Sequence, residues 1–322
     1  MTQTEYFNTK IPPDMEGYRL DKALAELFPS YSRARLQQWI RDGYVLINAA
    51  PWRGKDKVKG GEEVQITAQF EEEVAWQAQV LPLTLLYEDK EVLVVNKPAS
   101  LVVHPGAGNQ DNTLVNALLH HAPELAQLPR AGIVHRIDKD TSGVLVVARS
   151  LPAHTHLVAQ LQGHEFMREY RAIVTGVLVA GGTVDAAIGR HPTHRTRMAV
   201  VENGKSAITH YRVIQRYRAH TLVRVQLETG RTHQIRVHFA YKRYPLLGDS
   251  VYGGRLQIPP NSSDTFRETL RTFSRQALHA ERLGLIHPSS GEWMQWEAPL
   301  PEDMQNLQVA LEKDRREHTN EN

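Results

Sequence analysis

The spacing of hydrophobic residues predicts a small helix-and-strand region near the N-terminus. Apolar residues recur at helical spacing within residues 20–27 and again within 36–40, and Ser32 stands where a second helix needs an N-cap. The stretches YVLIN and EEVQITA follow with strand-like alternation. Residues 17–76 are therefore expected to form a small module of two helices followed by a β-hairpin.

Strand patterns dominate the longer region, residues 85–311. Five stretches alternate or run apolar like strands, namely EVLVVN, GVLVVA, YRAIVTG, THYRVIQR and TLVRVQLE. Only NTLVNALLHHA, LPAHTHLVAQLQG and GRTHQIRVHFAYK have helical spacing. Many strands, few helices and no regular βα alternation predict an α+β domain with a mixed, largely antiparallel sheet.

The remaining segments are polar or short. Residues 1–16 are expected to be an N-terminal extension, and residues 77–84 a linker that completes the polar stretch EEEVAWQAQVLPLT. After Pro301 the pattern predicts a helix that frays into a disordered tail, residues 312–322, because that tail is almost entirely polar.

Composition narrows the class of protein. Of the 322 residues, 41% are hydrophobic and 23% charged, as in soluble globular proteins, and none is cysteine. The absence of cysteine excludes disulfides, thiolate nucleophiles and sulfur-ligated metals. There is no apolar run of signal-peptide or membrane-span length, so we expect a cytoplasmic protein without membrane contact. No heptad or apolar seam stands out, which favours a monomer.

Positive charge is concentrated in one part of the chain, although the net charge is only +2. Between residues 190 and 243 there are twelve Lys or Arg residues but only two acids, Glu202 and Glu228. In HYRVIQRYRAHTLVRVQL these cations alternate with apolar residues, so many would share one face of a sheet. Such a face suits a polyanion, above all nucleic acid, although an ordinary solvated face is the simpler alternative.

The stretch GIVHRIDKDTSG, residues 132–143, allows two interpretations. Asp138, Asp140, Ser142 and Gly143 have the spacing that opens a calcium loop. The twelfth position of such a loop needs a carboxylate, but Arg149 stands there, and the residues between form an apolar strand. The calcium interpretation fails, and Gly143 is expected to form a turn that feeds the strand. Asp138 and Asp140 then either cap that turn or supply a carboxylate for chemistry.

This stretch resembles motif II of the RluA-type pseudouridine synthases. Further motifs of the family occur in the same order, namely YEDKEVLVVNKPASLVVHPGAG upstream and then REYRAIVTG and LETGRTHQIRVHFA downstream. RHPTHRTRMAV and LLGDSVYGG match the subgroup that modifies large-subunit ribosomal RNA. Residues 17–76 resemble the S4 domain, a small RNA-binding module, except that Asn48-Ala49-Ala50 replaces the usual Asn-Gly turn.

The resemblance implies roles for individual residues. Asp138 would be the catalytic carboxylate and Arg236 its ion-pair partner, with Arg231 as second choice; an arginine favours the charged form of a carboxylate in a dry pocket. Tyr170 would stack on the target base, and its hydroxyl would take the proton from C5. Arg136 would fill the gap left by an extruded base, or else bind a flanking phosphate.

Other cations and histidines are expected to contact RNA. They are His135, Arg190, Arg195, Arg231 and His233 in the longer region, and Arg33, Arg35, Lys55 and Lys57 in the S4-like module. No cofactor is expected, because the base is detached, rotated and rejoined without redox chemistry or group transfer. No metal is expected either, because the paired histidines lack accompanying acids, and GAGNQD lacks the third glycine of a dinucleotide loop.

Three functions follow, in order of preference. The first is an isomerase acting on uridines of large-subunit ribosomal RNA, free or in an assembling subunit; the subgroup resemblance indicates the helix 69 stem-loop. The second is a non-catalytic RNA-binding assembly factor on the same fold, for which Asp138, Tyr170 and the motif arginines would be superfluous. The third, a metal-dependent nuclease, lacks the acidic cluster it needs. The S4-like module either orients the RNA or only adds affinity.

Overall fold

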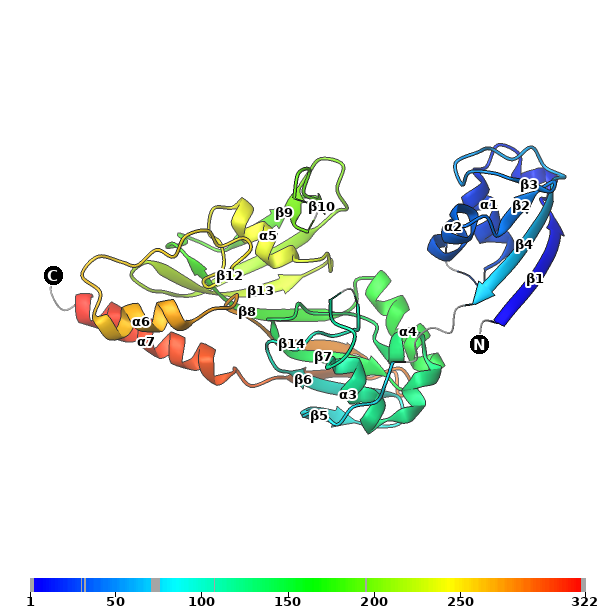
Figure 1. Cartoon of the computed structure of the whole chain (residues 1–322). Helices are drawn as coiled ribbons and strands as arrows, with labels where there is room; N and C mark the ends of the chain where they lie inside the picture. Colours follow the sequence, from blue (N-terminus) through cyan, green and yellow to red (C-terminus); the bar gives the residue numbers. More distant parts are fainter. Residues whose placement is uncertain are drawn as a thin grey trace. The chain divides into compact units, whose positions relative to one another are not determined.

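The chain folds into two compact units, residues 1–75 and 76–322 (Figure 1). The computed structural model describes residues 3–29, 31, 33–70, 76–106, 108–194 and 196–319. The expected N-cap Ser32 and the expected RNA contact Arg195 lie outside the described residues.

The first unit contains the two predicted helices, α1 (Leu20–Leu27) and α2 (Arg33–Arg41), against one four-stranded sheet. The sheet has the order β1-β4-β2-β3, with bounds Gln3–Lys10, Glu63–Phe70, Val45–Ile47 and Ala50–Pro51. Leu20, Leu24, Leu36 and Trp39 are at most 2% exposed and form its core. Full burial of each such side chain contributes about 1.5–3 kcal/mol.

The prediction of an N-terminal extension was wrong, because residues 3–10 form strand β1. This strand pairs antiparallel with β4 along its whole length, from Gln3 opposite Phe70 to Lys10 opposite Glu63. The ring of Phe7 lies 5.6 Å from that of Phe28, so β1 is anchored by apolar packing as well as by the ladder. Two adjacent aromatic residues, Tyr6 and Phe7, are the only apolar positions in this otherwise polar strand, so its sequence carries little hydrophobic signal.

The unusual turn sequence still forms a tight hairpin. Strands β2 and β3 pair antiparallel, with Ile47 opposite Ala50, and Asn48 and Ala49 have φ of 49° and 62°. Two left-handed residues are what a two-residue hairpin turn of type I′ requires. Ala49 thus occupies a conformation that glycine adopts more easily, and the Asn48 Oδ1 accepts a hydrogen bond from Glu63 N at 2.9 Å.

A nine-stranded sheet forms the centre of the second unit. Its order is β5-β6-β7-β14-β8-β13-β12-β9, with β15 paired to β14. The bounds are β5 Leu85–Glu88, β6 Val92–Lys97, β7 Ser142–Ala148, β8 Met167–Thr175, β9 Gly182–Asp185, β12 Ile208–Arg216, β13 His220–Leu227, β14 Leu278–Ile286 and β15 Trp293–Glu297. Among these pairs β7–β14 is parallel and the others are antiparallel. The prediction of an α+β fold with a mixed, largely antiparallel sheet is confirmed.

The sequence did not reveal the central strand β14. Its neighbours β7 and β8 were predicted, but LHAERLGLI places a charged pair in the middle of the apolar run. The structure resolves the conflict with a register shift between Ala280 and Arg282 and an ion pair between the buried Glu281 and Arg171 of β8. The register shift interrupts the alternation of buried and exposed side chains, and the ion pair allows a charged residue at a buried position. The hydrophobic pattern of β14 therefore lacks the period of two that marks a strand in a sequence.

Five α-helices surround the sheet within the described part of this unit. They are α3 (Leu114–His121), α4 (Leu151–Gln162), α5 (Gln234–Tyr241), α6 (Asp264–Thr272) and α7 (Glu302–Thr319). Short 3-10 turns, η2 (Pro123–Gln127) and η3 (Pro129–Gly132), follow α3, while η1 (Pro13–Met15) belongs to the first unit. Strands β10 (Ile188–Arg190) and β11 (Met198–Val200) form a separate hairpin. None of the described helices has the length and apolar character that a bilayer crossing requires.

The expected disordered tail and linker are also corrected. Helix α7 continues to Thr319 because Leu311 is buried beside α6 and because Arg218 Nη2 forms an ion pair with Asp314 Oδ1 at 2.8 Å. Residues 77–84 have no regular secondary structure, yet they are fixed to α3. The Asn116 side chain donates to Gln77 O at 2.7 Å, and Gln79 N donates to Asn116 O at 2.9 Å.

Candidate active site

Asp138 opens a tight turn between Ile137 and strand β7. Thr141 N donates to Asp138 O at 3.0 Å and closes that turn. The buried Lys97, at the end of β6, donates to Lys139 O at 2.8 Å, and Arg275 donates to Asp140 O at 3.1 Å. The turn is thus fixed by side chains of two other segments, which gives the carboxylate a defined position.

Two glycines bring the ends of GIVHRIDKDTSG against neighbouring backbone. Gly132 has φ of +77°, and a Cβ there would lie 2.0 Å from Ala148 O. Gly143 has φ of +116°, and a Cβ would lie 2.1 Å from Ala280 O of β14. The expectation that Gly143 forms a turn was wrong, since it lies within β7 and permits the close parallel approach of β14.

The Arg236 guanidinium, beside this turn, lies between two carboxylates, those of Asp138 and Asp249. Arg236 on α5 donates from Nη1 to Asp138 Oδ2 at 3.1 Å, and from Nε and Nη2 to Asp249 at 2.8 and 2.9 Å. The Asp249 side chain is fully buried, that of Arg236 is 7% exposed and that of Asp138 is 19% exposed. Burial raises the pKa of Asp249, but the Arg236 hydrogen bonds outweigh it and leave the pKa below its ordinary value. Of the two carboxylates, that of Asp138 remains accessible.

The accessible side of Asp138 faces a cavity of about 600 Å³. Tyr170 of β8 lines the same cavity and is 7% exposed, and burial, with the nearby Asp138 charge, raises the pKa of its hydroxyl. His233, the left-handed N-cap of α5, lies with Nε2 3.9 Å from Asp138 Oδ1. The structure therefore brings Asp138, Arg236 and Tyr170 together around one concave, partly apolar site.

Comparison with known proteins identifies the kind of enzyme that has this site. The model of the RNA pseudouridylate synthase family matches residues 91–241, and that of the S4 domain matches residues 19–64. Ribosomal large subunit pseudouridine synthase D of Escherichia coli is 53% identical over 322 residues, which cover 100% of this chain and 99% of that protein. The chain belongs to the RNA pseudouridylate synthase family.

Further relatives agree with this assignment of a pseudouridine synthase. Ribosomal large subunit pseudouridine synthase D of Pseudomonas aeruginosa is 55% identical over 306 residues, covering 95% of this chain and 96% of that protein. Among solved structures, human RNA pseudouridylate synthase domain containing 1 has a TM-score of 0.56 at 26% identity, covering 72% of this chain and 89% of that one. The predicted enzyme class and the S4-like resemblance are confirmed.

The other residues singled out from the sequence of this pseudouridine synthase have varied positions. Arg136, Arg231 and His233 line the cavity. His135 also lines it, but its Nε2 accepts a hydrogen bond from Val146 N at 3.1 Å, and burial, then Arg168, lowers its pKa to about 3. A neutral ring already bonded to β7 positions the motif rather than offering a cation to RNA. Arg190 is exposed at the end of β10, outside the cavity lining.

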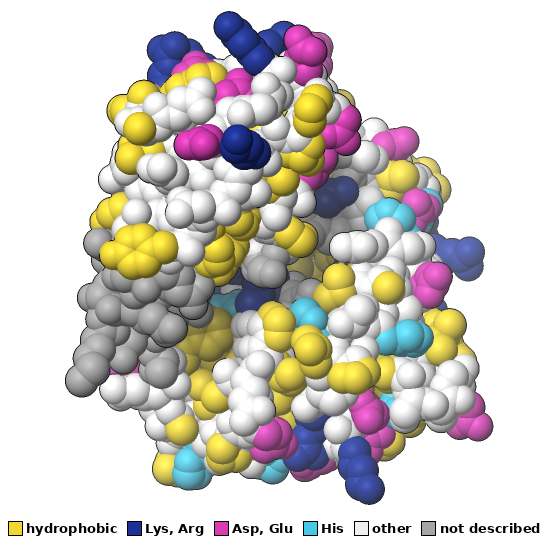
Figure 2. Space-filling model, turned by 90° about the vertical axis from the view of Figure 1, so that its right-hand side faces the viewer, with side chains coloured by type: hydrophobic (Ala, Val, Ile, Leu, Met, Phe, Trp, Pro, Cys, Tyr) yellow, Lys and Arg dark blue, Asp and Glu magenta, His cyan; other side chains and the backbone are white. Residues whose placement is uncertain are grey.

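The expected RNA contacts of the first unit separate into two kinds. Lys55 and Lys57 are exposed in the segment between β3 and β4. Arg33 is half-exposed, but its Nη2 donates to the buried Asp21 at 2.9 Å, and Arg35 is partly buried. Lys and Arg side chains are scattered among acidic ones on the face drawn in Figure 2 and form no single patch there.

Two residues that shape the site were not predicted from the sequence. Asp249 lies in LLGDSVYGG, and its only signal was an acid within a motif already quoted for the resemblance. Lys97 follows the apolar run EVLVVN, where a lysine suggests the exposed end of a strand. It is fully buried instead and donates to three carbonyl oxygens, and burial lowers its pKa to about 7 despite the nearby Asp140 and Asp138. The sequence around Asp249 and Lys97 does not indicate which groups these two side chains bind.

Among the described residues, no three His, Asp or Glu side chains converge as metal ligands would. The polar groups around the Asp138 turn are instead bonded to one another and to backbone. The lining combines five arginines with Asp138 as its acid. This charge balance suits the phosphates of an RNA substrate.

Proposed function

We propose that this protein converts uridines of large-subunit ribosomal RNA to pseudouridine at the cavity beside Asp138. Support comes from the hydrogen-bonded series Asp138–Arg236–Asp249, which leaves one carboxylate accessible in a cavity whose other lining residues are arginines, neutral polar groups and apolar groups. The relatives from Escherichia coli and Pseudomonas aeruginosa are named for the large ribosomal subunit. Within that RNA, the helix 69 stem-loop is the proposed site, on the resemblance of RHPTHRTRMAV and LLGDSVYGG.

The Asp138 carboxylate acts as the nucleophile. Isomerisation requires the bond between base nitrogen and ribose to break, the base to rotate and a carbon–carbon bond to form in its place. Burial lowers the pKa of the Arg236 guanidinium, but the hydrogen bonds and charges of Asp249 and Asp138 outweigh it and hold the pKa above its ordinary value, so Arg236 stays charged beside the nucleophile. The reaction is internal to the nucleotide, so these residues need supply no redox equivalent.

Tyr170 and Arg136 handle the base. A uridine must leave its stack to reach a concave site, at a cost of a few kcal/mol. Tyr170 presents its ring within the cavity for stacking, while exposed Arg136 lines the cavity and takes the space left by the extruded base. The raised pKa of Tyr170 means that its hydroxyl is neutral at physiological pH, which supports stacking more strongly than proton abstraction.

Asp138→Asn tests the central assignment. The amide keeps the size of the carboxylate but removes the nucleophile, so turnover should fall by at least about 10⁴-fold while RNA affinity changes less than about threefold. Pseudouridine would be mapped chemically on unmodified ribosomal RNA, with binding measured in parallel. Asp140→Asn, in the same turn but outside the cavity lining, is the matched control and should remain active. Retained turnover in Asp138→Asn would remove this residue as nucleophile.

Tyr170→Phe separates the ring from the hydroxyl. Phenylalanine keeps the stacking face, so on the stacking assignment its single-turnover rate should stay within about tenfold of the wild-type rate. Tyr170→Ala removes base–aromatic stacking, which contributes about 1–3 kcal/mol, so its rate should fall by a further 10- to 100-fold. If Phe and Ala are equally slow, the hydroxyl is the essential group and the stacking assignment is wrong.

A further inference from the structure

An unusual turn precedes the Asp138 motif. Arg130 has φ of 53° and ψ of 34°, Ala131 has φ of 51° and ψ of 41°, and Gly132 has φ of +77°. Residues other than glycine adopt left-handed conformations one at a time, and such strain concentrates at functional sites. The turn is fixed from behind, because Ala131 is buried, Gly132 meets Ala148, and Ile133 bridges to Val147 of β7. What the strained backbone presents outward is the side chain of Arg130.

Arg130 lines the cavity, and its side chain has no partner among the residues that the structure describes. Its guanidinium forms no hydrogen bond or ion pair with any residue that the structure describes, although it is exposed and lines the cavity. The arginines deeper in the cavity are engaged. Arg236 binds two carboxylates, and Arg168 donates to Glu228 O at 2.9 Å. Arg130 is therefore available to an anion from outside the protein.

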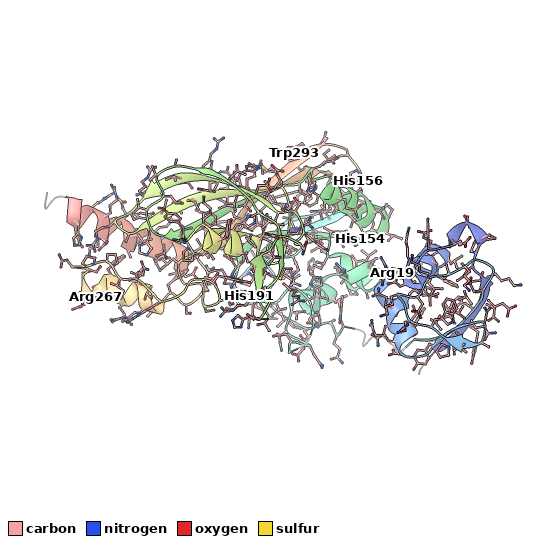
Figure 3. All side chains as sticks on the ribbon, turned by 90° about the horizontal axis from the view of Figure 1, so that it is seen from above. Arg19, His154, His156, His191, Arg267 and Trp293 are labelled. Carbon is pink, nitrogen blue, oxygen red and sulfur yellow. The ribbon has the colours of Figure 1, made fainter. Side chains whose placement is uncertain are left out.

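Apolar and neutral groups lie next to Arg130 in the cavity. Val158 and Leu161 of α4 belong to the lining, as does His104. The pKa of His104 is lowered to about 4, first by burial and then by Arg136 and Arg130, so both guanidiniums lie near a neutral ring. Burial and Arg130 also lower the pKa of His154, which projects from α4 in Figure 3. Asp138 is the acid in the cavity lining, and its carboxylate accepts a hydrogen bond from Arg236 of α5.

We propose that this end of the cavity, formed by His104, Arg130, Val158 and Leu161, is a second subsite that binds the nucleotide adjacent to the target uridine. This inference rests on the proposed function. A cavity of about 600 Å³ is in the range that encloses a drug-sized ligand and exceeds what one pyrimidine base needs. Arg130 binds the phosphate of the neighbouring nucleotide, and the base of that nucleotide contacts Val158 and Leu161. The strained turn fixes the distance between this phosphate and the Asp138 carboxylate.

A phosphate-by-residue double-mutant cycle tests the subsite. The probe is a synthetic stem-loop of large-subunit ribosomal RNA in which single phosphodiesters around the target uridine are replaced by neutral methylphosphonates. Kd is measured in the Asp138→Asn background, with and without Arg130→Ala, and rates are measured in the active protein. Loss of one charge-assisted contact should weaken binding about 10- to 100-fold. We expect that loss at one phosphate adjacent to the target.

The coupling is the decisive quantity. With Arg130→Ala present, neutralising that phosphate should have no further effect, and Arg130→Lys should restore part of the affinity. Arg267→Ala is the matched control, because this partly exposed arginine lies on α6, well apart from His154 of α4 (Figure 3). It should leave the full methylphosphonate effect. Thermal unfolding of each variant checks that the fold is retained.

The possible outcomes separate the two proposals. Additive effects of Arg130→Ala and every methylphosphonate, or an unchanged Kd in Arg130→Ala, would overturn the subsite. A coupled phosphate with no pseudouridine formed by the active protein would leave the subsite standing and contradict the proposed function. If Arg130→Ala proves unstable, the methylphosphonate scan is repeated with Arg130→Lys. The lysine side chain is shorter, so the loss of affinity on neutralising the sensitive phosphate should become smaller or move to a different phosphate.

Discussion

Each unit contains a cluster of arginine and buried aspartate. The two clusters have the same residue types but different roles. In the first unit, Asp21 is fully buried and accepts hydrogen bonds from Arg19, Arg33 and Gln37 at 2.6–3.1 Å. In the second, Arg236 is shared between the buried Asp249 and the accessible Asp138. The Asp21 cluster ties α1 to α2, whereas the Asp138 cluster opens on a cavity.

The difference lies in which group is left incompletely bonded. Both oxygens of Asp21 are satisfied, and although burial raises its pKa, hydrogen bonds from Arg19, Gln37 and Arg33 lower the pKa to about 2. Among the described residues, Asp138 accepts a side-chain hydrogen bond from Arg236 at Oδ2, whereas His233 Nε2 lies 3.9 Å from Oδ1, beyond hydrogen-bonding distance. A saturated carboxylate stabilises a fold, and one held by a single donor at a cavity is suited to react.

Asp249→Asn should have the largest effect on this comparison. The amide still accepts from Val251 N and Tyr252 N through Oδ1, but its NH₂ group meets the Arg236 guanidinium. Arg236 then loses the partner that orients it toward Asp138. Breaking a buried pair costs about 3–5 kcal/mol, so we expect turnover to fall at least about 100-fold and unfolding to require less denaturant.

Steady-state kinetics and urea unfolding on the same preparations measure both effects. Asp264→Asn removes a carboxylate paired with Arg267 at 3.7 Å on the surface and is the matched control, expected to be neutral. The Arg236 guanidinium also lies over the Tyr252 ring, with Cζ 5.1 Å from the ring centroid. Activity within twofold of wild type in Asp249→Asn would mean that Asp138 and Tyr252 suffice to orient Arg236, and the two clusters would no longer differ in the way argued above.

Asp21→Asn should affect stability alone. Both guanidiniums around Asp21 are half-exposed, so water screens their charges and the expected loss is about 2 kcal/mol, below the range for fully buried pairs. Hydrogen exchange of the full chain, followed by mass spectrometry, should show faster opening within residues 11–66. The single-turnover rate on bound RNA should stay within about twofold of wild type.

The same variant makes a pH prediction. The folded-state pKa of Asp21, about 2, lies below the ordinary value of 3.8, so its ionisation stabilises the fold above that value. The contribution disappears as the pH falls through 3.8 toward 2. The stability difference between wild type and Asp21→Asn should therefore shrink over this interval. A difference that stays constant down to pH 2 would exclude charge as the source of stability.

The sequence predicts those parts of the two clusters that depend on nearby residues, and it does not predict partners that lie far away along the chain. The helices that carry Asp21 and Arg33 followed from apolar spacing, and Asp138, Tyr170 and Arg236 followed from local motifs that the structure brings to one cavity. Their partners did not follow from any local pattern, because Asp249 lies 13 residues from Arg236 beyond the end of α5.

Strand β14 and the left-handed turn were missed for related reasons. The Glu281–Arg282 pair in β14 is neutralised by Arg171 and Glu169 of β8, more than 100 residues away in sequence, and by Glu297 of β15. The conformation of Arg130 depends on Gly132 pressing against Ala148. Periodicity describes how one element faces a core, and it carries no information about which charges another element will neutralise.

Gln37→Ala should have the smallest effect on stability. It tests whether the Asp21 carboxylate needs every one of its hydrogen-bond donors. Gln37 Nε2 donates to Asp21 Oδ2 at 2.6 Å, but Arg19 Nη2 donates to the same oxygen at 3.0 Å. Removing one neutral donor from a carboxylate that keeps its charged partners should cost about 1 kcal/mol, measured by urea unfolding. Gln38→Ala, next along α2 with a side chain that bonds the exposed Asp42, is the control and should cost less. If Gln37→Ala costs as much as Asp21→Asn, the cluster depends on every donor and has no redundancy.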